Sequence, residues 1–271
     1  MIQLNELVEY LDNLLEIDLI AKDHSNNGLQ VQGNSEVKKI IFGVDASIEM
    51  IEIAEKLNAD FIFVHHGISW GSNLKYISGN NYSRINPLIK NDISLYGAHL
   101  PLDAHPVIGH NAKLADLMGL NDKEMFCQYG NTEIGVKGTL QEPVSVSELN
   151  KYLDSKLGLM IKNNCSNVYS KTVSEHNYIM DNSEKGLIQK IGIISGGAGS
   201  DGVLGAIDAG LDCLITGEFG HSTYYTAKEN GLSIIAPGHY KTEVPGIIAV
   251  MEKINAELNI ETEFVNIPTG L

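Results

Sequence analysis

The first fifteen residues place apolar and polar side chains at the spacing of an amphipathic helix. The apolar residues recur every three or four positions, so they share one face of a helix of about four turns. They are Leu4, Leu7, Val8, Leu11, Leu14 and Leu15. A polar stretch over 23–28 follows, and its Asn27-Gly28 pair is typical of a tight turn. We interpret this stretch as a turn and assign it no other role.

From residue 39 onward, short continuous apolar runs replace the helical pattern. Runs such as 61–64 lack polar alternation, which is typical of parallel strands covered on both faces. Amphipathic segments lie between the runs, and Ser47 is placed to cap the first of them. The pattern predicts strands at 40–44, 61–64 and 94–98 and helices at 48–57, 84–90 and 110–118.

The same order of patterns returns near the end of the chain. The segment 189–194 repeats the character of 38–42, and the run that ends at Glu218 aligns with the run that ends at His66. Two further pairs align at an offset of 140 residues, namely His99 with His239 and Asp103 with Glu243. We therefore expect an internal repeat.

Histidines and carboxylates gather where the predicted strands end. Ligands of open α/β sheets lie beyond the carboxyl ends of the strands, so these side chains are expected to meet. Imidazole with carboxylate, and no cysteine, suits zinc, manganese or iron better than calcium. Adjacent side chains of an extended chain point to opposite faces, so each residue of the His-His pair is expected to serve a different ion of a pair. The residues are His65, His66, His99, Asp103, His239 and Glu243.

These patterns predict an α/β protein in which two repeated strand–helix–strand units form one metal-binding core. The middle of the chain lacks the repeat: a strand-like run at 136–140 and a helical pattern at 145–157 indicate a smaller α+β insertion. The expected domains are 1–120 for the first α/β repeat, 121–188 for the insertion, and 189–271 for the second repeat, packed with the first.

The composition excludes several classes of protein. A formal net charge of −15 argues against a general nucleic-acid-binding surface, so no nucleic acid partner is expected. No apolar run approaches the ~18 residues of a membrane span, and no targeting segment is recognised. Three widely spaced cysteines, without a C-x-x-C pair, indicate reduced thiols. We expect a cytoplasmic protein without a membrane partner.

The strand-end motifs resemble those of the NIF-three-like dinuclear metal centre family, many of whose members are named GTP cyclohydrolase 1 type 2 homologues. The motifs are His65-His66-Gly67, His99-Leu100-Pro101-Leu102-Asp103-Ala104-His105-Pro106, Gly217-Glu218, Gly238-His239-Tyr240-Lys241-Thr242-Glu243 and Asn27-Gly28-Leu29-Gln30-Val31. The resemblance covers almost the whole chain and implies the compact form of the family. It further implies a homohexameric toroid and two divalent metal ions per chain (zinc, manganese or iron). Their implied ligands are His65, His66, Asp103, His239 and Glu243.

The resemblance also implies a metal-dependent hydrolase with a small-molecule substrate. The family's name suggests a nucleotide, GTP, whose guanine imidazole ring would be opened by a metal-bound hydroxide, with His99 and Glu218 as proton shuttles. The residues themselves contain no base-recognition motif, and a phosphoester or amide would use the same ions. The alternative is a metal-bound scaffold or regulatory interaction protein without turnover, because the family's name comes from a protein interaction.

Other candidates have a structural interpretation beside the functional one. Residues 195–200 follow a strand and precede a helix, so their backbone N–H groups could bind phosphate. The stretch matches neither a dinucleotide fingerprint nor a P-loop, and we interpret it as a tight turn. Packing as a core histidine explains His99 equally well, whereas the alignment of Glu218 with His66 favours a functional role for Glu218. The histidines of polar segments are assigned no role; they are His24, His110, His176 and His221.

Overall fold

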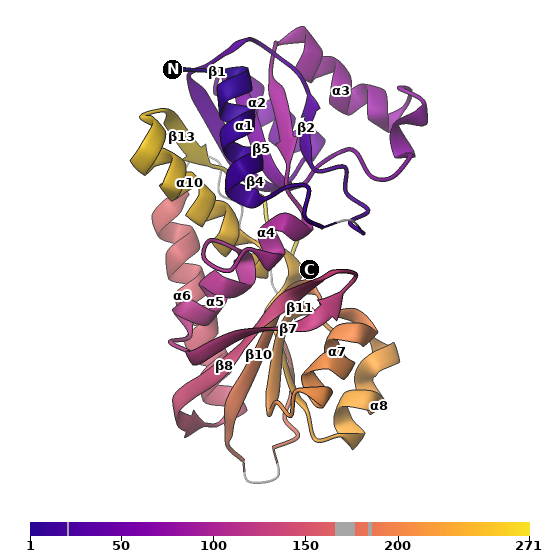
Figure 1. Ribbon diagram of the computed structural model, residues 1–271, viewed down its shortest axis with the longest axis vertical. Helices are drawn as coiled ribbons and strands as arrows, with labels where there is room; N and C mark the ends of the chain where they lie inside the picture. The colour runs from indigo at the N-terminus through magenta and orange to yellow at the C-terminus, as the bar shows by residue number, and fades with distance from the viewer. Residues whose placement is uncertain (21, 166–176, 184–185) are drawn as a thin grey trace. The chain divides into compact units, whose positions relative to one another are not determined.

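The computed structural model describes residues 1–20, 22–165, 177–183 and 186–271. The chain forms two compact units, each with its own sheet and core (Figure 1). Unit 1 consists mainly of Met1–Leu102 and Ile247–Ile267. Unit 2 consists mainly of Asp103–Asn163 and the described residues of 177–246.

Unit 1 contains a five-stranded sheet in the order β13-β4-β5-β6-β2. Its first four strands pair in parallel, whereas β2 is antiparallel to β6. The start of β2 therefore lies beside the carboxyl end of β6. A separate two-stranded pair joins β1 (Ile2–Gln3) to β3 (Glu36–Val37). The strands of the large sheet are β2 (Gly28–Val31), β4 (Lys39–Asp45), β5 (Phe61–His66), β6 (Ser94–Gly97) and β13 (Glu261–Phe264).

Helices cover both faces of this sheet. The predicted amphipathic helix is confirmed as α1 (Leu4–Leu15), whose buried residues are Leu4, Leu7, Leu11 and Leu15. On one face, Tyr96 of β6 donates a hydrogen bond to Asp12 of α1 at 2.7 Å. The opposite face packs in one apolar core with α2 (Ile48–Lys56) and α3 (Asn80–Lys90). The predicted cap of α2 is also confirmed, since the Ser47 hydroxyl accepts from the N–H of Met50.

Unit 2 contains a six-stranded sheet in the order β7-β8-β10-β11-β12-β9. The three strands β10, β11 and β12 are parallel, and the flanking pairs are antiparallel. The strands are β7 (Asn121–Tyr129), β8 (Thr132–Val144), β9 (Tyr178–Met180), β10 (Ile188–Gly197), β11 (Cys213–Glu218) and β12 (Ser233–Ala236).

The helices of unit 2 form a layer on each face of its sheet. One apolar core joins α5 and α6 to alternate strand residues such as Ile193 and Ile215. A second core joins α7 and α8, which lie side by side in Figure 1, to Ile194 and Leu214. These helices are α5 (His110–Leu117), α6 (Val146–Asn164), α7 (Gly199–Asp208) and α8 (His221–Glu229). The remaining helices are the 3-10 turn η1 (Asn73–Lys75), α4 (Leu100–Ala104), α9 (His239–Thr242) and α10 (Val244–Leu258).

The predicted α/β fold is confirmed. Each unit contains a strand–helix–strand–helix–strand segment with parallel strands, namely β4-α2-β5-α3-β6 in unit 1 and β10-α7-β11-α8-β12 in unit 2. Among the described residues, no helix is both long enough and apolar enough to cross a membrane.

The structure divides the chain at other points than the predicted 120 and 188. The stretch 121–188, expected to be an insertion, supplies edge strands to the sheet of unit 2, because β8 pairs with β10 and β9 pairs with β12. The C-terminal residues 247–267 belong to unit 1 and not to the second repeat, because β13 pairs with β4.

Candidate metal centre

Three of the predicted residues lie together at the carboxyl ends of β5 and β6 in unit 1. His65 and His66 are the last two residues of β5, and His99 follows β6. Each ring offers one potential ligand atom, and the three atoms lie within 4.8 Å of one another. The ring centroids of His65 and His66 are 4.5 Å apart, and His66 is the last residue of the strand. This distance does not test whether the two histidines bind different ions, so that assignment stays a prediction.

The two histidines of β5 both turn their Nδ1 atoms to an oxygen. His65 Nδ1 lies 2.9 Å from the carbonyl oxygen of Ala98, and His66 Nδ1 lies 2.9 Å from Oδ1 of Asp45. Asp45 reaches His66 because the two residues are paired in the register of β4 and β5. An oxygen acceptor places the ring proton of a neutral imidazole on Nδ1 and the lone pair on Nε2. This is the arrangement of metal-binding histidines, whose other nitrogen donates to a carbonyl or carboxylate.

His99 has a similar partner, Asp23, which the sequence analysis missed. Asp23 Oδ1 lies 2.8 Å from His99 Nδ1, and Oδ2 accepts from the N–H of Leu100 and the amide of Asn27. Burial raises the pKa of Asp23, but hydrogen bonds from His99, Asn27 and the Ser25 N–H outweigh it and lower the pKa to about 2. The turn before β2 reaches His99 because β2 starts where β6 ends.

In unit 2, His239 lies between two carboxylates. Its Nε2 is 3.0 Å from Oε1 of Glu243, and its Nδ1 is 3.4 Å from Oε1 of Glu218. Burial lowers the pKa of His239, but Glu243 and then Glu218 outweigh it and raise the pKa to about 9. An imidazolium held between two acids marks a position where a divalent cation is electrostatically favoured.

The backbones of β10 and β11 fit closely against the His239–Glu243 pair. A Cβ atom at Gly196 would lie 2.3 Å from Glu243 Oε1 and 3.0 Å from His239 Nε2. A Cβ atom at Gly217 would lie 2.6 Å from the Cα atom of His239. The N–H of Gly196 also donates to the hydroxyl of Thr242 at 3.0 Å. Only glycine at these two positions leaves room for the pair.

Asp103 is fixed to the other side of β10 in unit 2. The Ser195 hydroxyl donates to Asp103 Oδ1 at 2.7 Å. The N–H of Ser195 donates to Oδ1 of Asn111, whose amide donates to the carbonyl oxygen of Asp103. Ser195 and Gly196, assigned to a turn from the sequence, are therefore strand residues that position the carboxylates, while α7 begins only at Gly199.

Two other histidines show the opposite arrangement. Nδ1 of His110 accepts from the N–H of Gly246 at 3.0 Å. Nδ1 of His105 accepts from the N–H groups of Val107 and Ile108. Their ring protons therefore lie on Nε2, which makes them hydrogen-bond donors. His110 is fully buried, and one of its ring nitrogens lies within 4.8 Å of a carboxylate oxygen of Asp103. Its tautomer nevertheless disfavours metal binding, because Nε2 carries the proton and Nδ1 already accepts a hydrogen bond.

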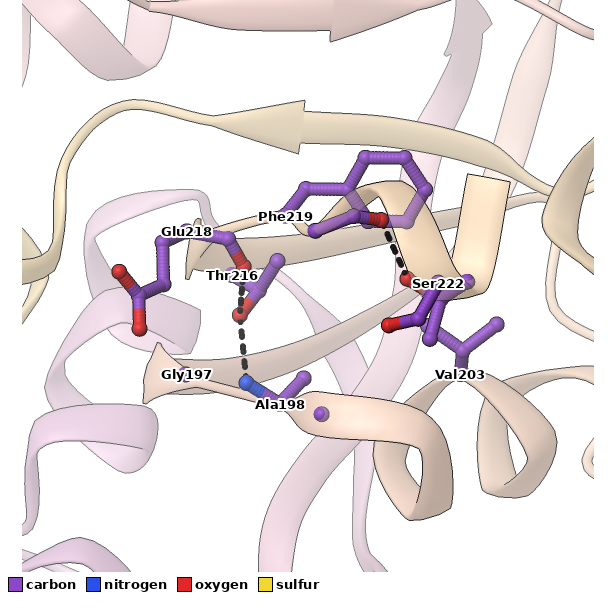
Figure 2. Close-up of a pocket in the computed structure, with 10 residues that line it drawn as sticks. Gly197, Ala198, Val203, Thr216, Glu218, Phe219 and Ser222 are labelled. Atoms are coloured by element: carbon purple, nitrogen blue, oxygen red, sulfur yellow. Dashed lines mark hydrogen bonds between the residues drawn. The ribbon is translucent and has the colours of Figure 1, made fainter.

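A cavity of about 380 Å³ opens at the carboxyl ends of β10 and β11 (Figure 2). Glu218, which contacts His239, lies on its wall. Figure 2 shows the Glu218 carboxylate at one side of the cavity and Phe219 and Ser222 at the other. Val203 adds an apolar wall. The volume lies at the lower end of the range for small-molecule sites.

The fold and these donor sets define an α/β protein whose units carry histidine and carboxylate groups suited to divalent transition metals. The chain belongs to the Duf34/NIF3 (NGG1p interacting factor 3) family, whose sequence profile matches residues 2–269.

Curated relatives over nearly the full length are named GTP cyclohydrolase 1 type 2 homolog. The protein of Archaeoglobus fulgidus is 38% identical over 268 residues, which cover 99% of both chains, and that of Haemophilus influenzae is 39% identical over 266 residues, 97% of both. Among solved structures, the protein ybgI, described as of unknown function, has a TM-score of 0.87 at 33% identity over the whole of both chains. TTHA1606 from Thermus thermophilus has a TM-score of 0.82 at 31% identity, also over the whole of both chains.

Proposed function

We propose that this chain is a dinuclear metal-dependent hydrolase that acts on a small molecule. The proposed ions are two divalent cations per chain, zinc, manganese or iron, because the donors are imidazoles and carboxylates without thiolates. By the resemblance to its family, we propose a cytoplasmic homohexamer. By the same resemblance, the proposed ligands are His65, His66, Asp103, His239 and Glu243.

The observation that carries this proposal is the orientation of the imidazole rings. His65 and His66 each present Nδ1 to an oxygen at 2.9 Å, which leaves Nε2 as the coordinating nitrogen. Nε2 of His239 lies 3.0 Å from Glu243, so two donors of the proposed set already converge. Histidines that only fill space have no reason to share one tautomer, and His110, which is equally buried, has the other one.

Divalent ions in such a set lower the pKa of a bound water and stabilise negative charge that develops on the substrate. The side chains around them have separate tasks. For Glu218, the contact with His239 Nδ1 favours an orienting role over the predicted proton transfer. His99 remains the proposed proton shuttle.

The relatives' name suggests GTP as the substrate and hydrolytic opening of the guanine imidazole ring as the reaction. The cavity beside Glu218 has the volume to hold part of such a molecule next to His239. A phosphoester or amide substrate would use the same donor sets, so these compounds belong in the same assay.

Elemental analysis of protein purified without chelator tests the metal site. We expect about two ions per chain in the wild type, and their loss in a variant with both His65→Ala and His66→Ala. Wild-type protein that contains no metal and cannot be reloaded would refute the proposal.

Glu243→Gln separates catalysis from scaffolding. In a hydrolase, this change abolishes GTP turnover, which is measured as the loss of the purine absorbance band. The oligomer, measured by light scattering, stays intact. If the oligomer dissociates instead, the metal is structural, and the chain is a metal-bound scaffold or regulatory interaction protein.

A further inference from the structure

Unit 1 contains a buried carboxylate–imidazole pair, Asp23 and His99, outside the proposed ligand set. The side chain of Asp23 is 3% exposed and that of His99 is 23% exposed. The carboxylate accepts four hydrogen bonds, two on each oxygen: Oδ1 from His99 Nδ1 and the Ser25 N–H, Oδ2 from Asn27 and the Leu100 N–H. All four distances lie between 2.8 and 3.0 Å. The orientation of the carboxylate is therefore fixed.

The His99 ring is held as firmly as its partner. The backbone N–H of His99 donates to Oδ1 of Asn27 at 2.8 Å, and the Trp70 ring packs edge-on with its centroid 4.9 Å from that of His99. Trp70 is itself fixed, because its indole N–H donates to the carbonyl oxygen of Gly67 at 2.8 Å. Since Nδ1 is committed to Asp23, Nε2 is the nitrogen that His99 presents to its surroundings.

The three clustered histidines of unit 1, namely His65, His66 and His99, differ in the charge of the group that faces Nδ1. The acceptor of His65 is a neutral backbone carbonyl, and that of His66 is Asp45, whose side chain is 38% exposed and therefore screened by water. The acceptor of His99 is the buried Asp23. Of the three, His99 is oriented by a buried carboxylate, which fixes its Nδ1 as a donor and leaves Nε2 as an acceptor.

We propose that Asp23 is the positioning residue of a proton-transfer pair and that His99 Nε2 is the proton acceptor of the site. This inference rests on the proposed hydrolase function. As the oxygen of a water molecule bonds to the electrophilic carbon of the substrate, one O–H bond of that water breaks and its proton moves to Nε2. Asp23 then balances the charge of the imidazolium. The same proton passes to the leaving atom when the substrate bond breaks, which restores neutral His99.

The first test is the tautomer of His99 in metal-free protein labelled with ¹⁵N-histidine. Long-range ¹H–¹⁵N correlation spectra distinguish protonation at Nδ1 from protonation at Nε2, and His99→Ala assigns the signals by their loss. We expect the wild-type ring to be protonated at Nδ1, and Asp23→Asn to abolish that preference. A wild-type His99 ring protonated at Nε2 instead would refute the proposal that Asp23 positions His99. The wild-type spectrum decides this even if the variant fails to fold.

The second test separates a proton acceptor from a third imidazole ligand. If His99 accepts protons, His99→Ala and Asp23→Asn keep the wild-type metal content, and kcat falls about 100-fold or more with little change in KM. A loss of metal in either variant would show that His99 is a ligand, and an unchanged kcat would also overturn the proposal. Asp12→Asn is the control: Asp12 also accepts a hydrogen bond within unit 1, from Tyr96 at 2.7 Å, and kcat should stay unchanged.

The two proposals fail in different ways. Wild-type protein without metal or turnover refutes the hydrolase, whatever the tautomer of His99. A metal-loaded, active wild type whose rate is insensitive to Asp23→Asn refutes the pair alone.

Discussion

Replacing Gly196 with alanine tests whether the end of β10 shapes the proposed metal site. Gly196 has a φ of +60°, and its added Cβ would lie 2.3 Å from Oε1 of Glu243. Real Cβ atoms essentially never approach another heavy atom within 3.0 Å, so the carboxylate would have to move. The same Cβ would lie 3.0 Å from His239 Nε2, so the shift disturbs both donors. We expect Gly196→Ala to weaken metal binding.

Two effects of this substitution have to be separated. The left-handed backbone costs a residue with a Cβ about 1–2 kcal/mol of folding stability, whatever it touches. Disturbing the groups that position metal ligands lowers affinity about 10–100-fold, equivalent to about 1.4–2.8 kcal/mol. Gly199→Ala is the matched control, because Gly199 has a φ of +58° and nothing lies within 4 Å of its added Cβ. Gly199→Ala therefore has the same cost in folding stability from the left-handed backbone, but its Cβ contacts no proposed metal ligand.

Zinc affinity, measured by competition with a chromophoric chelator, and thermal unfolding of the metal-free proteins separate these effects. We expect both variants to lose similar amounts of stability without metal, and only Gly196→Ala to lose zinc affinity. Equal zinc affinity in the two variants would refute the reasoning, because the close approach of Gly196 to Glu243 would then have no role in binding.

Two further predictions concern unit 1. Trp70 is the single tryptophan of the chain, and its ring centroid lies 5.9 Å from that of His66. Adding Co²⁺ to metal-free protein should therefore quench the fluorescence of Trp70. The substitution His66→Ala should abolish most of this quenching. The pKa of Asp23 is about 2 in the folded protein, against an ordinary 3.8. Ionised Asp23 therefore contributes about 2 kcal/mol to the free energy of unfolding above pH 4. About half of this contribution is lost as the pH falls to 3. Urea unfolding at pH 6 and pH 3 should therefore show the stability difference between wild type and Asp23→Asn narrowing by about 1 kcal/mol; a constant difference would contradict the assignment.

The sequence predicted the parallel strands and the histidines at their ends, because continuous apolar runs and the residues that follow them are local features. It missed partners supplied by distant pairing. Asp23 lies 76 residues from His99 and belongs to a stretch that resembles any polar turn. Only the antiparallel pairing of β2 with β6 brings that turn to the histidine. The predicted domain boundaries differ from the structure for a similar reason, since nothing local in β8 indicates that it pairs with β10.

Residue type alone also leaves undecided which histidines can bind a metal. His99 and His110 are separated by ten residues in the sequence, and neither has a local pattern that reveals its tautomer. In the structure, the first donates from Nδ1 to a carboxylate and the second accepts at Nδ1 from a backbone N–H. The lone pair is therefore on Nε2 in one ring and the proton is on Nε2 in the other. The group that faces Nδ1 thus decides whether Nε2 carries the lone pair or the proton. In both histidines the fold supplies that group.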